Sequence, residues 1–181
     1  MTTKTYNTAL VLTPPESVWG PIQEIRRAHD RHFGRWMPHI TLLYPFRPCE
    51  LFDEAAAQLA PVCAAILPFS LTLAEFRHFR HGRSSYTVWL APEPNEPVIR
   101  LQQALMAVLP DCDDVARHAH GVTPHLSVGQ CRGSEALREW QQTLAASWRP
   151  LSLIVHGINF IRRGDLPDDV FRVDRHLPLG A

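Results

Sequence analysis

Apolar and polar positions alternate along some segments of the chain and recur every three or four positions along others. The alternation from Phe69 through Leu73 has the two-residue period of a half-buried strand, and the stripe of Val98, Leu101 and Leu105 has helical spacing. Strands are predicted over residues 8–12, 39–44, 69–79, 86–90, 125–130, 151–162 and 170–176. Helices are predicted over residues 18–32, 51–66, 96–109 and 134–148, with Pro61 distorting the second helix.

The predicted elements follow the order β-α-β-α-β twice, over approximately residues 6–80 and 84–177. Two copies at this period indicate two similar units that bury their apolar faces together, because a solenoid needs three or more repeats. No low-complexity tract or clear linker divides the chain. We therefore expect residues 1–181 to form one domain with two lobes.

Composition restricts the partners of this domain. The 181 residues carry no formal net charge, so an extended basic surface for duplex nucleic acid is not expected. A nucleotide or an RNA terminus remains a suitable ligand, because local charge in a cleft is sufficient for either. We expect a monomer.

The location is predicted from what the sequence lacks. No apolar run approaches the roughly 20 residues of a membrane helix, and the N-terminal segment does not resemble a signal peptide. The four cysteines are far apart and form no Cys-x-x-Cys pair, as in reduced cytoplasmic proteins. A cytoplasmic location without membrane attachment is therefore expected.

One short motif occurs in the middle strand of each half. Residues 38–42 read PHITL and residues 124–128 read PHLSV, with the two histidines 86 positions apart. In a strand, alternate side chains point to opposite faces. His39 and Thr41 then share one face, as do His125 and Ser127, while the intervening apolar residues face a core. The initial proline suits a strand start, where no ladder donor is needed.

An imidazole beside a hydroxyl, present twice, provides two proton-transfer groups and two hydrogen-bond donors for one substrate. Histidine suits both proton donation and proton acceptance, because its ordinary pKa of about 6.5 is close to working pH. The hydroxyls would donate to phosphate oxygens on which charge develops. This set predicts phosphoester chemistry without a metal. Which histidine is the acid and which is the base stays open.

The segments PHITLLYPF and PHLSVGQ resemble the signature of the two-histidine phosphoesterases, a superfamily that includes 2′-5′ RNA ligase-like proteins and cyclic nucleotide phosphodiesterases. Phe79, residues 86–90 and residues 172–180 are similar to the layout of that family, so the resemblance covers nearly the whole chain. It implies an α+β fold in which two pseudo-symmetric lobes with antiparallel sheets surround a central cleft. Ser127 stands where threonine is common and supplies the same hydroxyl.

The resemblance also implies a site and an activity. His39 and His125 would be catalytic, and Thr41 and Ser127 would contact phosphate. The enzyme would hydrolyse 2′,3′-cyclic phosphodiesters or 2′-5′ linkages of RNA ends or nucleotides without a cofactor, and would exchange the histidine roles in reverse as a 2′-5′ RNA ligase. The alternative is a module that binds a nucleotide or an RNA terminus with little turnover.

Further residues are weaker candidates for substrate binding. Arg35, Trp36 and Tyr44 flank the first motif and could bind phosphate or stack on a base, although packing and solvation are the commoner roles of such residues. Arg80 lies in a cationic stretch expected in a hairpin turn, and Arg162 ends a predicted strand. Each arginine could reach a phosphate or remain a solvated surface residue.

Other histidines could suggest a metal. His29 and His32 are three positions apart on a predicted helix, but no third ligand lies near them in the sequence. His118 and His120 precede His125, which the repeated motif explains better, and they are expected in a surface loop. No metal site is predicted.

Overall fold

Two four-stranded antiparallel sheets form the framework of the computed structural model, which describes residues 3–117 and 121–180. The first sheet has the strand order β2-β1-β7-β8 and contains β1 (Thr8–Leu12), β2 (Ile40–Leu43), β7 (Gly157–Arg162) and β8 (Arg172–Pro178). The second has the order β5-β4-β3-β6 and contains β3 (Phe69–His81), β4 (Ser85–Glu93), β5 (Leu126–Arg132) and β6 (Leu151–Val155).

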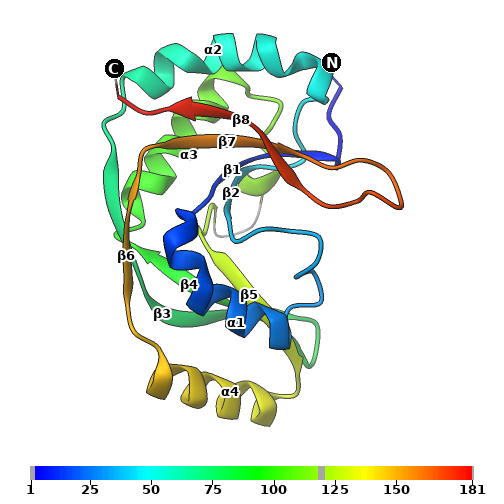
Figure 1. Cartoon of the computed structure of the whole chain (residues 1–181), viewed down its shortest axis with the longest axis vertical. Helices are drawn as coiled ribbons and strands as arrows, with labels where there is room; N and C mark the ends of the chain where they lie inside the picture. Colours follow the sequence, from blue (N-terminus) through cyan, green and yellow to red (C-terminus); the bar gives the residue numbers. More distant parts are fainter. Residues whose placement is uncertain (1–2, 118–120, 181) are drawn as a thin grey trace.

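Helices cover the two sheets from opposite ends of the molecule (Figure 1). The α-helices are α1 (Trp19–His29), α2 (Phe52–Ala64), α3 (Glu96–Val108) and α4 (Ser134–Ser147), and short 3₁₀ turns occupy Glu16–Val18, Cys49–Leu51 and Asp114–Ala116. Helices α2 and α3 contact the first sheet, whereas α1 and α4 contact the second. All four predicted helices are present, and α2 continues through Pro61. The predicted α+β class with two antiparallel sheets is confirmed.

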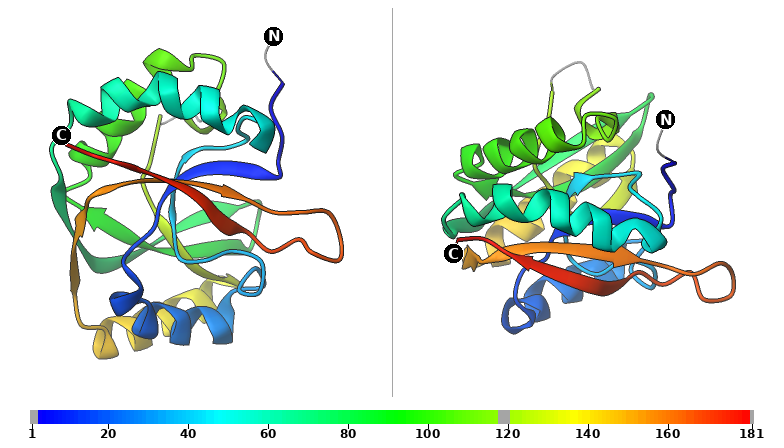
Figure 2. Two further views of the ribbon diagram at one scale, coloured as in Figure 1. Left: turned by 45° about the horizontal axis from the view of Figure 1, so that its top comes forward. Right: turned by 90° about the horizontal axis from the view of Figure 1, so that it is seen from above.

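The two halves of the chain exchange strands between the sheets. Strand β3 comes from the first half but lies between β4 and β6 in the second sheet, and β7 and β8 come from the second half but complete the first sheet. Figure 2 shows the resulting crossing of early and late segments. The lobes are therefore not the two sequence halves. One domain over residues 1–181 with repeats near 6–80 and 84–177 stays a prediction.

The single strand predicted over residues 151–162 is wrong. Strand β6 pairs with β3 and β7 pairs with β1, so the chain changes sheets at the exposed His156. Gly157 permits the new pairing, because a Cβ there would lie 2.5 Å from the Leu177 carbonyl oxygen and 2.4 Å from the His176 ring. The apolar positions continue across the break, which is why the pattern alone indicated one strand.

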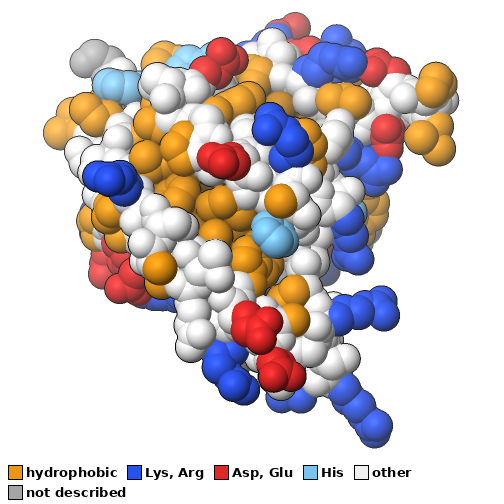
Figure 3. Space-filling model, turned by 60° about the horizontal axis from the view of Figure 1, so that its bottom comes forward, with side chains coloured by type: hydrophobic (Ala, Val, Ile, Leu, Met, Phe, Trp, Pro, Cys, Tyr) orange, Lys and Arg blue, Asp and Glu red, His pale blue; other side chains and the backbone are white. Residues whose placement is uncertain are grey.

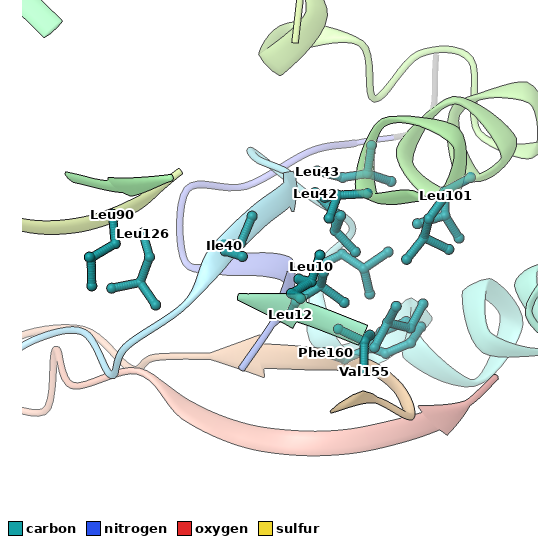
Figure 4. Close-up of a cluster of buried hydrophobic side chains, with 14 of the residues drawn as sticks. Leu10, Leu12, Ile40, Leu42, Leu43, Leu90, Leu101, Leu126, Val155 and Phe160 are labelled. Carbon is teal, nitrogen blue, oxygen red and sulfur yellow. The ribbon is translucent and has the colours of Figure 1, made fainter. Parts of the chain in front are cut away.

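A shared hydrophobic core joins the two sheets. Leu10 and Leu42 from the first sheet and Leu90 and Leu126 from the second belong to one buried cluster (Figure 4). Side chains of α2 and α3, such as Leu101, extend this cluster. The core therefore fixes the first motif strand relative to the second.

A smaller buried cluster lies on the opposite face of the first sheet. It contains Val11, Ile161 and Phe171, with Trp36 and Tyr44 packed against it. We call this face the cleft face of the first sheet, because Trp36 also borders the cavity described below.

The structure bears on membrane attachment and on the state of the cysteines. Within the described ranges, no helix is long and apolar enough to cross a membrane. The four cysteines form no disulfide, and burial raises the pKa of Cys63 to about 11, which makes it a poor nucleophile. The cytoplasmic location and the monomeric state stay predictions.

Candidate active site

The first motif places His39 directly before β2. Its Nδ1 donates a hydrogen bond to the carbonyl oxygen of Met37 at 2.7 Å. Because a carbonyl can only accept, this bond assigns the hydrogen of a neutral ring to Nδ1 and the lone pair to Nε2. Pro38, buried between them, holds the ring close to that carbonyl.

The second motif repeats this geometry. His125 lies directly before β5, and its Nδ1 donates to the carbonyl oxygen of Thr123, also at 2.7 Å. The same ring nitrogen therefore bonds to the same backbone position, two residues upstream, in both motifs. Strands β2 and β5 are in contact, and the charge of His125 acts on His39, so the two identical arrangements lie near each other.

The pKa of His39 is strongly lowered, to about 4. Removal from water is the main cause, and the positive charges of Arg26 and His125 act in the same direction. The Met37 carbonyl and the Asp30 carboxylate oppose the shift. His39 is therefore neutral at neutral pH, with its Nε2 able to accept a proton.

Aromatic side chains fix the orientation of both rings. Trp36 stacks on His39 with centroids 4.7 Å apart and an interplanar angle of 19°. Phe79 meets His125 edge to face at 4.9 Å, and Trp89 lies 5.9 Å from the same ring. Such contacts restrict ring rotation, which suits groups that must exchange protons in a defined geometry.

A cavity of about 230 Å³ lies where the start of β2 meets the second sheet. It is lined by Arg26, Asp30, Arg31, His32, Trp36, His39, Thr87, Ser127 and Gln130. The structure thus brings three predicted residues together, namely His39, Trp36 and Ser127. Thr41 is half-buried in β2, on the strand face that continues from His39, but it is not among the lining side chains of the described residues.

Strand pairing explains the second-sheet side of the cavity. Ser127 pairs with Trp89, and Gln130 pairs with Thr87, so all four side chains share one face of the sheet. The register shift within this pairing accommodates an additional residue of β5 between Ser127 and Gln130. Gln130 therefore points to the same side as Ser127 although it is three positions away.

A buried ion pair at the end of α1 was not predicted. Arg26 and Asp30 are 2 % and 8 % exposed, with a nitrogen–oxygen distance of 2.9 Å. Arg26 also donates to the carbonyl oxygen of Trp36 at 2.8 Å, and Gln130 donates to Asp30 at 3.1 Å. The pair thus connects the segment before His39 with the strand after His125. Its sequence signal is an arginine four positions after the buried Ile22, on the apolar side of the helix.

The weaker candidates lie in several environments. Arg35 forms an ion pair with Asp169, and the hydroxyl of Tyr44 donates to the Tyr6 carbonyl oxygen at 3.2 Å. These residues flank Trp36, but neither of them is among the described residues that line the cavity.

The other two arginines make contacts away from the cavity. Arg80 donates to the carbonyl oxygens of Gly82 and Arg83 and so closes the hairpin turn. Arg162 is held by Asp174 at 2.6 Å. Neither lines the cavity within the described part of the chain.

The histidines outside the motifs do not form a metal cluster in the described residues, where no three His, Cys, Asp or Glu side chains are arranged to hold an ion. His29 packs against Trp140, with ring centroids 4.3 Å apart, in an apolar groove between α1 and α4 (Figure 3). His32 borders the cavity. His118 and His120 lie outside the described residues.

Strands β2 and β5, which each begin directly after a histidine, contact each other, although within the described residues only His39 of the two histidines lines the cavity. Two antiparallel sheets joined in this way define an α+β protein of the two-histidine type. The family model described as the 2′-5′ RNA ligase superfamily matches residues 14–166. The chain belongs to this superfamily.

Relatives agree with this assignment. A "Putative phosphoesterase" of Geobacillus kaustophilus is 27% identical over 122 residues, 67% of each chain. Among solved structures, TT0787 of Thermus thermophilus aligns with a TM-score of 0.65 and 20% identity over 95% of this chain and 97% of its own. Escherichia coli LigT complexed with 3′-AMP aligns with a TM-score of 0.65 and 15% identity over 97% and 99%. Family, relatives and fold together support a phosphoesterase-type enzyme.

Proposed function

We propose that the chain is a metal-independent phosphoesterase that hydrolyses 2′,3′-cyclic phosphodiesters or 2′-5′ linkages of RNA ends or nucleotides. One observation carries the proposal: His39 and His125 each donate from Nδ1 to the carbonyl two residues upstream, at 2.7 Å. Each neutral ring then uses Nε2 for proton exchange. Two rings prepared alike suit a reaction that needs one base and one acid.

The lowered pKa of His39 supports an assignment of roles. Neutral His39 accepts a proton from water through Nε2 as the water oxygen forms its bond to phosphorus. The bond between phosphorus and a ribose oxygen breaks on the opposite side, and protonated His125 gives its proton to that departing oxygen. The product is a phosphomonoester, His39 is left protonated and His125 is left neutral, and exchange of protons with solvent restores both rings before the next turnover. In the ligation direction the roles are exchanged.

Hydroxyl groups supply the remaining interactions of this proposal. Ser127 borders the cavity beside His39, and Thr41 follows His39 on the same strand face. Both would donate hydrogen bonds to the non-bridging phosphate oxygens, where negative charge increases in the transition state.

The substrate class rests on chemistry and on relatives. LigT has been solved complexed with 3′-AMP, with ATP and with phosphate. A cavity of about 230 Å³ whose wall includes Arg31 and hydrogen-bonding side chains suits a nucleotide phosphate better than a duplex. A small nucleotide or an RNA terminus is therefore the proposed ligand.

The test compares wild type with His39→Ala and His125→Ala on 2′,3′-cyclic nucleotides and 2′-5′ dinucleotides, with products separated by chromatography. Each variant should lose about 10²–10⁴-fold in turnover and keep its fold. His156→Ala is the matched control, because His156 is exposed at the junction of β6 and β7.

Chelators should leave the wild-type rate unchanged. Full activity in either histidine variant would overturn the proposed roles. Tight nucleotide binding without any product would instead favour the binding module.

A further inference from the structure

A column of stacked side chains leads away from His39 along the cleft face of the first sheet. Trp36 lies between His39 and Phe171, with centroid distances of 4.7 and 3.7 Å. The guanidinium carbon of Arg163 also lies over the Phe171 ring, 5.5 Å from its centroid. The column therefore connects the cavity with a cation at the end of β7.

Arg163 differs sharply from its neighbour in sequence. Arg162 ends β7 and is paired with Asp174. Arg163 lies on the same side as Ile161, as its position over Phe171 shows. Within residues 3–117 and 121–180, no carboxylate pairs with Arg163, and its buried Nε lacks a hydrogen-bond partner. Arg163 borders a cavity of about 240 Å³ that Arg162, Asp168 and Asp174 also line, but neither of these carboxylates forms an ion pair with it. An anion could therefore approach the exposed part of its guanidinium.

Two tyrosines stand beside this cation. Tyr6 is 64 % exposed, and its ring packs edge to face with that of Tyr44, with centroids 5.6 Å apart. The bond from the Tyr44 hydroxyl to the Tyr6 carbonyl oxygen fixes the two segments together. Burial raises the pKa of Tyr44, and the charge of Arg163 opposes that shift, which is consistent with their proximity.

We propose that Arg163, Tyr6 and Tyr44 form a second subsite for single-stranded RNA, in which Arg163 binds the phosphodiester next to the terminal nucleotide and Tyr6 stacks on a base. This inference rests on the proposed function and narrows its substrate to an RNA end of two or more nucleotides.

The chemistry of the three side chains matches this ligand. Proteins bind single strands by combining cations that follow the backbone with exposed aromatic rings on which bases stack. A guanidinium also binds phosphate through several hydrogen bonds at once. Because the chain has no net charge, the attraction must come from local cations such as Arg163.

The binding experiment uses a trinucleotide that ends in a 3′-phosphate and the corresponding nucleoside 3′-monophosphate, both measured by calorimetry. Wild type should bind the trinucleotide about tenfold or more tightly than the mononucleotide. Arg163→Met keeps an aliphatic chain over Phe171 but removes the charge, and should abolish most of this advantage. Arg163→Lys should restore part of it.

The salt dependence provides a second readout. Loss of one phosphate contact should make the slope of log affinity against log salt less steep by about 0.7 for the trinucleotide. Arg162→Met is the matched control and should retain the wild-type slope and length preference, because Arg162 is paired with Asp174. Tyr6→Ala, at an exposed position, should weaken only trinucleotide binding.

Several results would overturn the subsite. These are an absence of length preference in wild type, equal losses on both ligands in Arg163→Met, or the same loss in Arg162→Met. The outcome is separable from the proposed activity. A length preference without turnover would retain the subsite and reject the enzyme, and turnover without length preference would do the reverse.

Discussion

Asp30 and Gln130, 100 positions apart, are joined by a hydrogen bond of 3.1 Å from the Gln130 amide to the Asp30 carboxylate. The same carboxylate accepts the backbone N–H of His32 at 2.9 Å and pairs with the buried Arg26. Arg26 in turn holds the carbonyl of Trp36. The end of α1 thus connects the segment that carries His39 with the strand that follows His125.

Asp30→Asn should strongly destabilise the protein. It leaves the buried Arg26 without its counter-charge, and breaking a buried ion pair costs about 3–5 kcal/mol. Urea unfolding would measure the change in the free energy of unfolding. The double variant Arg26→Met with Asp30→Asn removes the unpaired charge and should recover part of the loss. A single variant as stable as wild type would contradict this account.

The activity should persist to unusually low pH on the acid side. His39 must be neutral to accept a proton, and burial, Arg26 and His125 lower its pKa to about 4. The acid limb of kcat/KM, which reports the free enzyme, should therefore lie near pH 4 rather than near the ordinary histidine value of about 6.5. A pH–rate profile measures it. An acid limb near 6.5 would contradict the combination of a lowered pKa and the role of His39 as the base.

The stability of the fold should depend on the same group. His39 binds a proton less readily in the folded state than in the unfolded state, so the unfolded state holds more protons between about pH 4 and 6.5. The contribution is fully present above pH 6.5 and is lost as pH falls through this window. Unfolding free energies at several pH values should show a flatter dependence in His39→Gln than in wild type. Identical curves would contradict the lowered pKa.

Ser127 should act through its hydroxyl. Ser127→Ala should lower kcat by about 10²-fold, because it removes a donor to the charge that develops on phosphate oxygens. Ser127→Thr keeps the hydroxyl and should retain most of the activity. Steady-state kinetics on a 2′,3′-cyclic nucleotide would distinguish the two. Equal losses in both variants would indicate a packing role instead.

Local sequence determined much of this protein. The spacing of apolar residues specified all four helices and most strands, because an amphipathic segment can bury only one face. The two Pro-His motifs lie at the starts of β2 and β5, and their repetition indicated the family before any contact was known.

Only the tertiary structure decided how these elements combine. Alternation shows which side chains share a face of a strand, but it does not show which strand pairs with which, since pairing joins residues far apart in the chain. For that reason the sequence did not reveal three features of the fold. They are the break at His156, the place of β3 in the sheet of the other half, and the bond between Asp30 and Gln130. For the same reason, the sequence could not show which of Arg162 and Arg163 lies on the cleft face. Arg162 ends β7 and pairs with Asp174, Arg163 follows the strand, and only the packing of Phe171 showed that Arg163 lies on the cleft face.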